Sequence, residues 1–87
     1  MGKDLIKVVY NDEPIFTVEN PDVKKNIVER IMGFSAEISE VTLERPSDNT
    51  IRKAKKFELL KNEGLKFPAF GLFLLFPKGT EIYVYLD

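Results

Sequence analysis

The carboxylate side chains of this sequence fall into two groups that could bind a cation. The first comprises Asp12, Glu13, Glu19 and Asp22, and the second comprises Glu37, Glu40 and Glu44. Clustered carboxylate oxygens can hold Mg²⁺ or Ca²⁺. However, their spacing matches no calcium-binding loop, and a turn with a helix cap accounts for the first group. An exposed strand face accounts for the second, so the sequence predicts no metal site.

Basic residues are concentrated in residues 49–66, which hold six basic and two acidic side chains, whereas residues 11–23 hold four acidic and no basic ones. This asymmetry could steer a nucleic acid or an acidic partner to the basic segment. The candidate contacts are Arg52, Lys53, Lys55 and Lys56, followed by Lys61 and Lys66. The alternative is a solvated helix face. With 13 basic and 14 acidic residues in the whole chain, nucleic acid is the disfavoured partner, because such proteins usually carry a basic excess.

The sequence contains neither cysteine nor histidine. Thiolate nucleophiles and zinc sites built on these residues are therefore excluded, and the commonest general base near neutral pH is missing. No glycine spacing matches a dinucleotide- or phosphate-binding loop. We expect no cofactor and no catalytic residues, although Asp, Glu, Lys, Tyr and Ser could still support an enzyme.

Aromatic residues near the carboxyl end are candidates for contact with a protein partner. Such side chains bury a large area at a small cost in entropy. The candidates are Phe70, Tyr83 and Tyr85, with Phe73 beside them. The alternative is that they pack beneath the first helix or hairpin.

The elements that position these residues begin with a strand over residues 5–10, which are rich in β-branched side chains. Residues 11–14 are typical of a turn, and we favour a return strand over residues 15–18. Asn20, Pro21 and Asp22 begin a helix, which Gly33 ends. Its apolar positions are Val23, Ile27 and Ile31.

Residues 37–44 predict a strand with a bulge near Ser39 and Glu40, ended by Pro46. Residues 47–49 could cap a second helix that continues to Asn62. The apolar stripe of that helix would be Ile51, Ala54, Phe57 and Leu60, with Gly64 just beyond its end.

Residues 67–76 are almost all apolar. A short apolar run bounded by turn residues is typical of a strand buried on both faces. We therefore predict a central strand over residues 69–76, a type I turn over residues 76–79 and an antiparallel return over residues 80–86. The resulting order, β(β)αβαββ, predicts an α/β domain, with α+β as the alternative. It would have a mixed sheet of four to five strands, two helices and a C-terminal antiparallel hairpin.

The end of this order resembles the C-terminal half of the thioredoxin-like fold. The resemblance rests on a helix ending at residues 63–66, then Phe67-Pro68, an apolar strand, a Lys78-Gly79 turn and a last strand. It implies that Pro68 is the cis proline of that family and that residues 5–10 form its first core strand. The Cys-x-x-Cys motif of the family has no counterpart, and the interval from Pro68 to Gly79 is longer than usual. The resemblance therefore implies the fold without its redox activity.

The length of 87 residues suits one domain. We expect a cytoplasmic protein without membrane contact, since no apolar tract of about 20 residues and no signal peptide occurs. Many Lys and Glu residues without Gln or Trp suggest a thermophilic source. The function that we expect is a small non-catalytic binding domain, which self-associates or docks to a protein partner through its C-terminal hairpin. The alternative is binding of nucleic acid or an acidic partner through the basic second helix.

Overall fold

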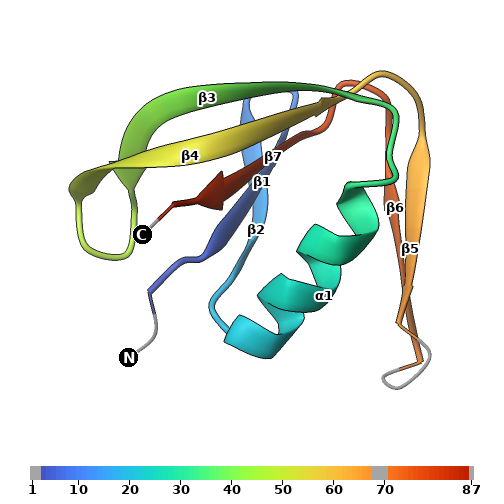
Figure 1. The fold of residues 1–87 in the computed structure, drawn as a ribbon, viewed down its shortest axis with the longest axis horizontal. Helices are drawn as coiled ribbons and strands as arrows, with labels where there is room; N and C mark the ends of the chain where they lie inside the picture. Colours follow the sequence, from blue (N-terminus) through green and yellow to red (C-terminus); the bar gives the residue numbers. More distant parts are fainter. Residues whose placement is uncertain (1–2, 68–70, 87) are drawn as a thin grey trace.

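The computed structural model describes residues 3–67 and 71–86, which form seven strands and one helix. In chain order these are β1 (Ile6–Tyr10), β2 (Glu13–Val18), α1 (Pro21–Ile31), β3 (Ala36–Arg45), β4 (Thr50–Leu59), β5 (Glu63–Phe67), β6 (Leu72–Phe76) and β7 (Glu81–Tyr85). Five strands form an antiparallel sheet in the order β2-β1-β7-β4-β3, and β5 pairs with β6 in a separate two-stranded sheet (Figure 1). No helix in the described part of the chain is long and apolar enough to cross a membrane.

The predicted N-terminal hairpin is confirmed. β1 and β2 pair antiparallel, and the two turn residues Asn11 and Asp12 have φ values of 54° and 64°. Positive φ at both central residues is the conformation that matches the twist of a tight hairpin, and Asn and Asp tolerate it well.

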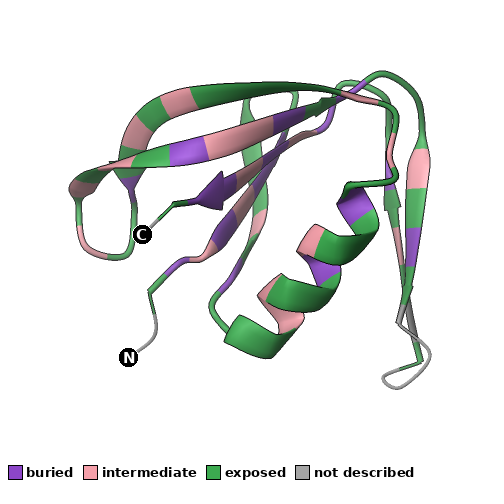
Figure 2. Cartoon of the chain, in the orientation of Figure 1, coloured by how far each residue is buried: buried purple, intermediate pink, exposed green. Residues whose placement is uncertain are grey.

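The first helix is also confirmed. Asn20 caps α1, because its side-chain oxygen accepts hydrogen bonds from the backbone amides of Asp22 at 2.8 Å and Val23 at 3.3 Å. Pro21 occupies the first turn, where its missing N–H costs nothing. Ile27 and Ile31 are the buried residues of α1 (Figure 2), so one stripe of the helix packs on the core.

The second helix predicted over residues 49–62 is wrong, because residues 50–59 form strand β4. The residues expected to cap a helix close the β3–β4 hairpin instead. Asn49 has a φ of 56°, and the Asp48 carboxylate accepts hydrogen bonds from the backbone N–H and hydroxyl of Thr50 at 3.2 and 2.6 Å. Ten residue pairs join β3 to β4, and β7 pairs with the other edge of β4. Backbone pairing on both sides overrides the weak helical spacing of the apolar residues.

The predicted strand at residues 37–44 is confirmed as β3, but the bulge near Ser39 is wrong. The register with β4 is unbroken from Ala36 opposite Leu59 to Arg45 opposite Thr50. Ile38 therefore lies on the face opposite to Val41 and Leu43, and its side chain is exposed. A bulge would be needed only if all three residues had to be buried together.

The C-terminal antiparallel hairpin is wrong as well, and with it the α/β class and the mixed sheet. Residues 81–85 form a strand as expected, but β7 lies at the centre of the large sheet between β1 and β4. β6 pairs with β5, so the turn after Phe76 carries the chain from one sheet to the other. Gly79 in this turn has a φ of 91°, which a residue with a side chain rarely adopts.

The apolar run is not a central strand buried on both faces. Leu74 and Phe76 face the core, whereas Phe73 is 56% and Leu75 66% exposed. The Phe73 ring lies over Gly64 of the paired strand, since a Cβ at that glycine would meet the ring at 3.0 Å. Pro68, Ala69 and Phe70, including the proposed cis proline, lie outside the described residues.

The core lies between one face of the large sheet, α1 and the inner face of the β5–β6 hairpin (Figures 1 and 2). Burial of apolar surface at about 25 cal/mol per Å² is the main force that holds these layers together. The buried cluster comprises Ile6, Val8, Val18, Ile27, Ile31, Phe57, Leu59, Leu65, Phe76, Ile82 and Val84.

Candidate functional site

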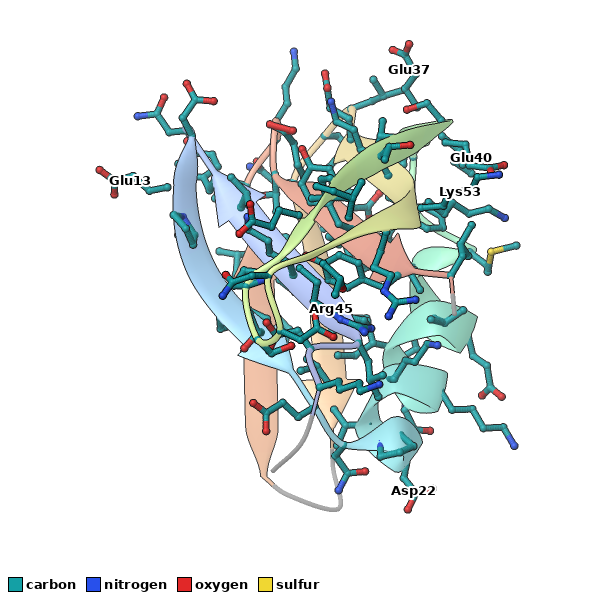
Figure 3. The ribbon with its side chains drawn as sticks, turned by 90° about the vertical axis from the view of Figure 1, so that its left-hand side faces the viewer. Glu13, Asp22, Glu37, Glu40, Arg45 and Lys53 are labelled. Atoms are coloured by element: carbon teal, nitrogen blue, oxygen red, sulfur yellow. The ribbon has the colours of Figure 1, made fainter. Side chains whose placement is uncertain are left out.

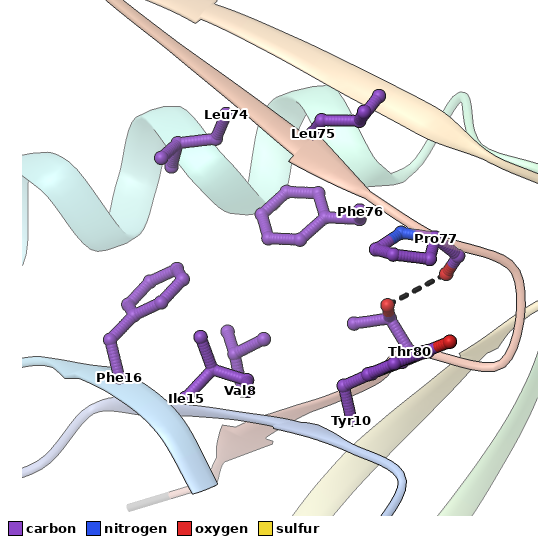
Figure 4. Close-up of a pocket in the computed structure, with 9 residues that line it drawn as sticks. All are labelled: Val8, Tyr10, Ile15, Phe16, Leu74, Leu75, Phe76, Pro77 and Thr80. Atoms are coloured by element: carbon purple, nitrogen blue, oxygen red, sulfur yellow. Dashed lines mark hydrogen bonds between the residues drawn. The ribbon is translucent and has the colours of Figure 1, made fainter.

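An apolar pocket of about 300 Å³ lies between the β1–β2 hairpin and β6 (Figure 4). Its lining comprises Val8, Tyr10, Ile15, Phe16, Leu74, Leu75, Phe76, Pro77 and Thr80. None of the described residues of this lining has a charged side chain. The Thr80 hydroxyl is already used, because it donates a hydrogen bond to the Pro77 carbonyl at 2.7 Å. The pocket therefore suits an apolar group much better than a charged one.

A β-bulge shapes one wall of the pocket. The register between β1 and β2 passes from Val8 opposite Phe16 to Val9 opposite Pro14, which leaves Ile15 without a partner residue. Adjacent residues of a regular strand point to opposite faces, but a bulge redirects a side chain. Ile15 and Phe16 consequently line the same pocket.

The free edge of β6 forms the opposite wall. Leu74, Leu75 and Phe76 are consecutive, yet all three line the pocket. Because their side chains alternate between two faces, the pocket must lie along the edge of the strand. That edge has no neighbouring strand among the described residues. The rings of Phe16 and Phe76 join the two walls with a centroid separation of 6.3 Å and an interplanar angle of 27°.

Three large apolar side chains of the lining are exposed, and we call Tyr10, Ile15 and Leu75 the apolar rim. Their exposed fractions are 40%, 56% and 66%. Phe73 is also exposed on the face of β6 that carries Leu75, but its ring lies over Gly64 of β5 and outside the pocket lining. A contiguous exposed apolar surface beside a cavity often marks an interaction site.

The aromatic residues proposed from the sequence do not lie together at this site. Tyr85 is buried, with the Arg45 guanidinium 5.9 Å from its ring centroid and the Glu44 carbonyl accepting from its hydroxyl at 3.5 Å. It is therefore not accessible to a partner in this structure. Tyr83 is half-buried on the sheet face that carries Lys56. Phe70 lies outside the described residues.

The basic residues proposed to contact nucleic acid are divided between the two faces of β4. Arg52 and Lys56 lie on one face, and Lys53 and Lys55 lie on the other, because side chains alternate along a strand. Lys56 forms ion pairs with Glu58 at 3.4 Å and Glu81 at 3.3 Å. Lys55 lies opposite Glu40 of β3. The structure therefore gives no continuous basic surface from these four residues.

The polar network around Lys56 is arranged for ion pairing. Burial alone would lower the pKa of Lys56, but the hydrogen bonds and charges of Glu81 and Glu58 outweigh it and raise this pKa. The Tyr83 hydroxyl donates to Glu81 at 2.5 Å, and this bond, with Lys56, lowers the pKa of Glu81. Burial, and then Glu81, raise the pKa of Tyr83. All three pKa values move away from neutrality, whereas acid–base catalysis near pH 7 needs them to approach it.

The arginine at the end of β3 belongs to a second network of the same kind. Arg45 is buried, and its guanidinium donates to the Asp48 carboxylate at 2.7 Å. Hydrogen bonds from Arg45 and then Thr50 lower the pKa of Asp48. Burial, and then the charge of Asp4, raise the pKa of Tyr85. These shifts also lead away from neutrality. The contacts of Arg45 and the Glu44 carbonyl with Tyr85 join the hairpin end of β3 to the end of β7.

The two groups of carboxylates lie far apart. Glu13 projects from the edge of β2, whereas Glu37 and Glu40 project from β3 on the opposite side of the molecule, and Asp22 lies at the start of α1 (Figure 3). Within residues 3–67 and 71–86 no three Asp or Glu side chains come together to hold a metal ion.

No known family model, curated protein sequence or solved structure matches this chain. The resemblance to the thioredoxin-like fold therefore stays a prediction.

Sequence reasoning missed Tyr10, Ile15 and Leu75 as site residues. Ile15 lines the pocket only because of the bulge, which is seen in the pairing of β1 with β2 and has no local signal in the sequence. Tyr10 and Leu75 have no local signal either, because they approach the pocket only through the packing of β6 beside the β1–β2 hairpin.

Proposed function

We propose that this chain is a protein-binding domain that receives apolar side chains of a protein partner in the pocket between β1, β2 and β6. The observation that carries this proposal is the apolar rim around an apolar pocket that is open to solvent. The site differs from the C-terminal hairpin that the sequence suggested, since β6 and β7 belong to different sheets.

The chemistry of the pocket supports a binding role. Its walls offer apolar contact area, and its buried hydroxyl is satisfied internally. Aromatic and aliphatic anchors seated in such pockets supply most of the free energy of many protein interfaces. Tyr10 adds a hydroxyl at the edge of the opening, where a partner can form a hydrogen bond without losing apolar contact.

Nucleic-acid binding stays the alternative prediction, but no specific observation favours it. Arg52, Lys53, Lys55 and Lys56 point to two faces of β4, and carboxylates lie beside Lys55 and Lys56. A phosphate backbone is bound best by several Lys and Arg side chains that lie on one surface.

Selection from a library of displayed random peptides tests the proposed function. We expect the wild-type domain to enrich peptides with large apolar residues, and Leu75→Glu to abolish the enrichment because it places a charge at the pocket opening. Ile51→Glu is the matched control, since Ile51 is also 66% exposed but lies on β4 outside the pocket lining.

Circular dichroism and urea unfolding should show that both variants fold. Equal enrichment by Leu75→Glu and Ile51→Glu would place binding elsewhere. Absence of any enrichment by the wild-type domain would contradict the proposed function.

A further inference from the structure

We propose that the apolar pocket between β1, β2 and β6 binds the indole ring of a tryptophan in the protein partner. This inference rests on the proposed function and adds the chemistry of the anchoring side chain. It is carried by the volume of the pocket, by the rings in its walls and by the neutral character of its described lining.

The volume of the pocket favours a large ring system. It is about 300 Å³, which is about twice the volume of an apolar cavity that holds one benzene molecule. A leucine side chain is smaller than benzene, so it would leave much of the pocket to water. The indole of tryptophan is the largest apolar ring system among the natural side chains, and it removes the most apolar area from water.

Aromatic rings from three strands line the pocket. They are Tyr10 of β1, Phe16 of β2 and Phe76 of β6 (Figure 4). The Phe16 and Phe76 centroids are 6.3 Å apart, within the range of favourable ring contacts. An aromatic anchor can extend this pair by edge-to-face or offset stacking, which contributes free energy beyond that of the buried area. An aliphatic anchor gains the buried area alone.

The charges beside the pocket favour a neutral anchor. Glu13 is the cross-strand partner of Tyr10, and Lys78 follows Pro77 in the chain; both charged side chains are exposed. Because the two signs occur beside the same pocket, neither an anion nor a cation is clearly attracted to it. A charge buried among the uncharged lining residues would also lose its hydration without gaining a partner.

The hydrogen-bonding groups of the lining restrict the choice of ring further. Thr80 is buried, and its hydroxyl donates to the Pro77 carbonyl at 2.7 Å. Among the described lining residues this leaves no buried side-chain donor free, so an acceptor atom on the anchor would lose its hydrogen bonds to water. The indole nitrogen is only a donor. It can face the exposed side of the pocket, where water or the Tyr10 hydroxyl can accept its proton.

Titration with three neutral amides, followed by NMR spectra of the methyl groups, tests the inference. N-acetyl-tryptophanamide, N-acetyl-phenylalaninamide and N-acetyl-leucinamide share one backbone and differ only in the side chain. We expect the tryptophan amide to shift the methyl signals of Ile15, Leu74 and Leu75. The signals of Ile51, which lies on β4 outside the pocket lining, should not change. The tryptophan amide should bind about tenfold tighter than the leucine amide, because about 60 Å² of additional buried apolar area corresponds to that factor.

The variant Phe16→Leu tests the aromatic wall, and Phe34→Leu is the matched control. Both phenylalanines are half-buried and pack against the core, and their ring centroids lie 6.3 and 6.4 Å from that of Phe76. Only Phe16 lines the pocket. We expect Phe16→Leu to lose most of the preference for the tryptophan amide and Phe34→Leu to keep it, with urea unfolding to show that both variants fold. An unchanged preference in Phe16→Leu would contradict the role of the aromatic wall. The wild-type titration decides the inference if a variant does not fold.

The outcomes separate the inference from the proposed function. A leucine amide that binds as tightly as the tryptophan amide overturns the indole as anchor, and so does a tryptophan amide that shifts no pocket methyl signal up to its solubility limit. Enrichment of displayed peptides that depends on Leu75 but selects leucine or isoleucine without tryptophan would also overturn it, while supporting the proposed function. Absence of any peptide enrichment would contradict both.

Discussion

Truncation of two phenylalanines, Phe57→Ala and Phe73→Ala, separates the observed architecture from one in which the apolar run forms the buried centre of the sheet. An enclosed phenylalanine buries about 200 Å², which at about 25 cal/mol per Å² corresponds to about 5 kcal/mol. Phe57 is only 1% exposed within the core cluster. We expect Phe57→Ala to lower the free energy of unfolding by about 3–5 kcal/mol, including the cost of the cavity.

Phe73 is 56% exposed, so folding removes less than half of its area from water. Its ring contacts Gly64, but truncation opens no closed cavity. We therefore expect Phe73→Ala to lower the free energy of unfolding by about 1–2 kcal/mol. This loss is well below the one expected if Phe73 lay in a central strand buried on both faces.

Urea unfolding followed by circular dichroism measures both costs, and unchanged slopes of free energy against urea concentration would show that the comparison is valid. A loss for Phe73→Ala as large as that for Phe57→Ala would mean that β6 is enclosed on both faces. The free edge of β6 and the exposed rim would then be wrong.

Two further substitutions test local features of the fold. Asp48→Asn should lower the urea midpoint at pH 7 but much less near pH 2. The pKa of Asp48 in the folded protein lies below its value of about 3.9 in the unfolded chain. The Asp48 carboxylate therefore stabilises the fold fully at a pH above about 3.9, and this stabilisation is lost as the pH falls below it. Equal effects at both pH values would contradict the role of the Arg45–Asp48 bond. Asn20→Ala should cost about 1 kcal/mol by removing the cap of α1, whereas Asn26→Ala in the exposed middle of the helix should cost almost nothing, and similar losses for both would contradict the cap.

Local signals were sufficient for four elements. The turn at Asn11 and Asp12, the Asn20-Pro21 helix start, the stop at Pro46 and the alternation from Ile82 to Tyr85 all reflect interactions within a few residues. Backbone preferences and capping depend little on distant parts of the chain. The sequence could therefore locate β1, α1, β3 and β7 before the arrangement of the sheet was known.

The identity of β4 depended on distant parts of the chain. Its apolar residues Ile51, Ala54 and Phe57 have helical spacing, and Lys and Glu favour a helix. In the structure Ala54 and Phe57 lie on different faces of β4. Ala54 is the cross-strand partner of Tyr85 in β7, and Phe57 is the partner of Ile82. Strand propensity depends strongly on such cross-strand neighbours, which no local pattern reveals.

The pocket could not be predicted for a related reason. Its lining comes from β1, β2, β6 and the turn before β7. β1 and β2 belong to the five-stranded sheet, whereas β6 belongs to the two-stranded sheet. The sequence identified the apolar run but predicted burial on both faces, because composition alone does not show how many layers cover a strand.

The free strand edges of this fold differ in a way that supports β6 as the binding element. Natural proteins protect exposed edges with charges, prolines and bulges. β2 carries Glu13, Pro14 and a bulge, β3 carries three glutamates, and β5 carries Glu63 and Lys66. β6 has the sequence LFLLF, with no charge and no proline. An edge without these protections promotes aggregation if it stays exposed, and this is a further argument for the proposed binding of a partner beside β6.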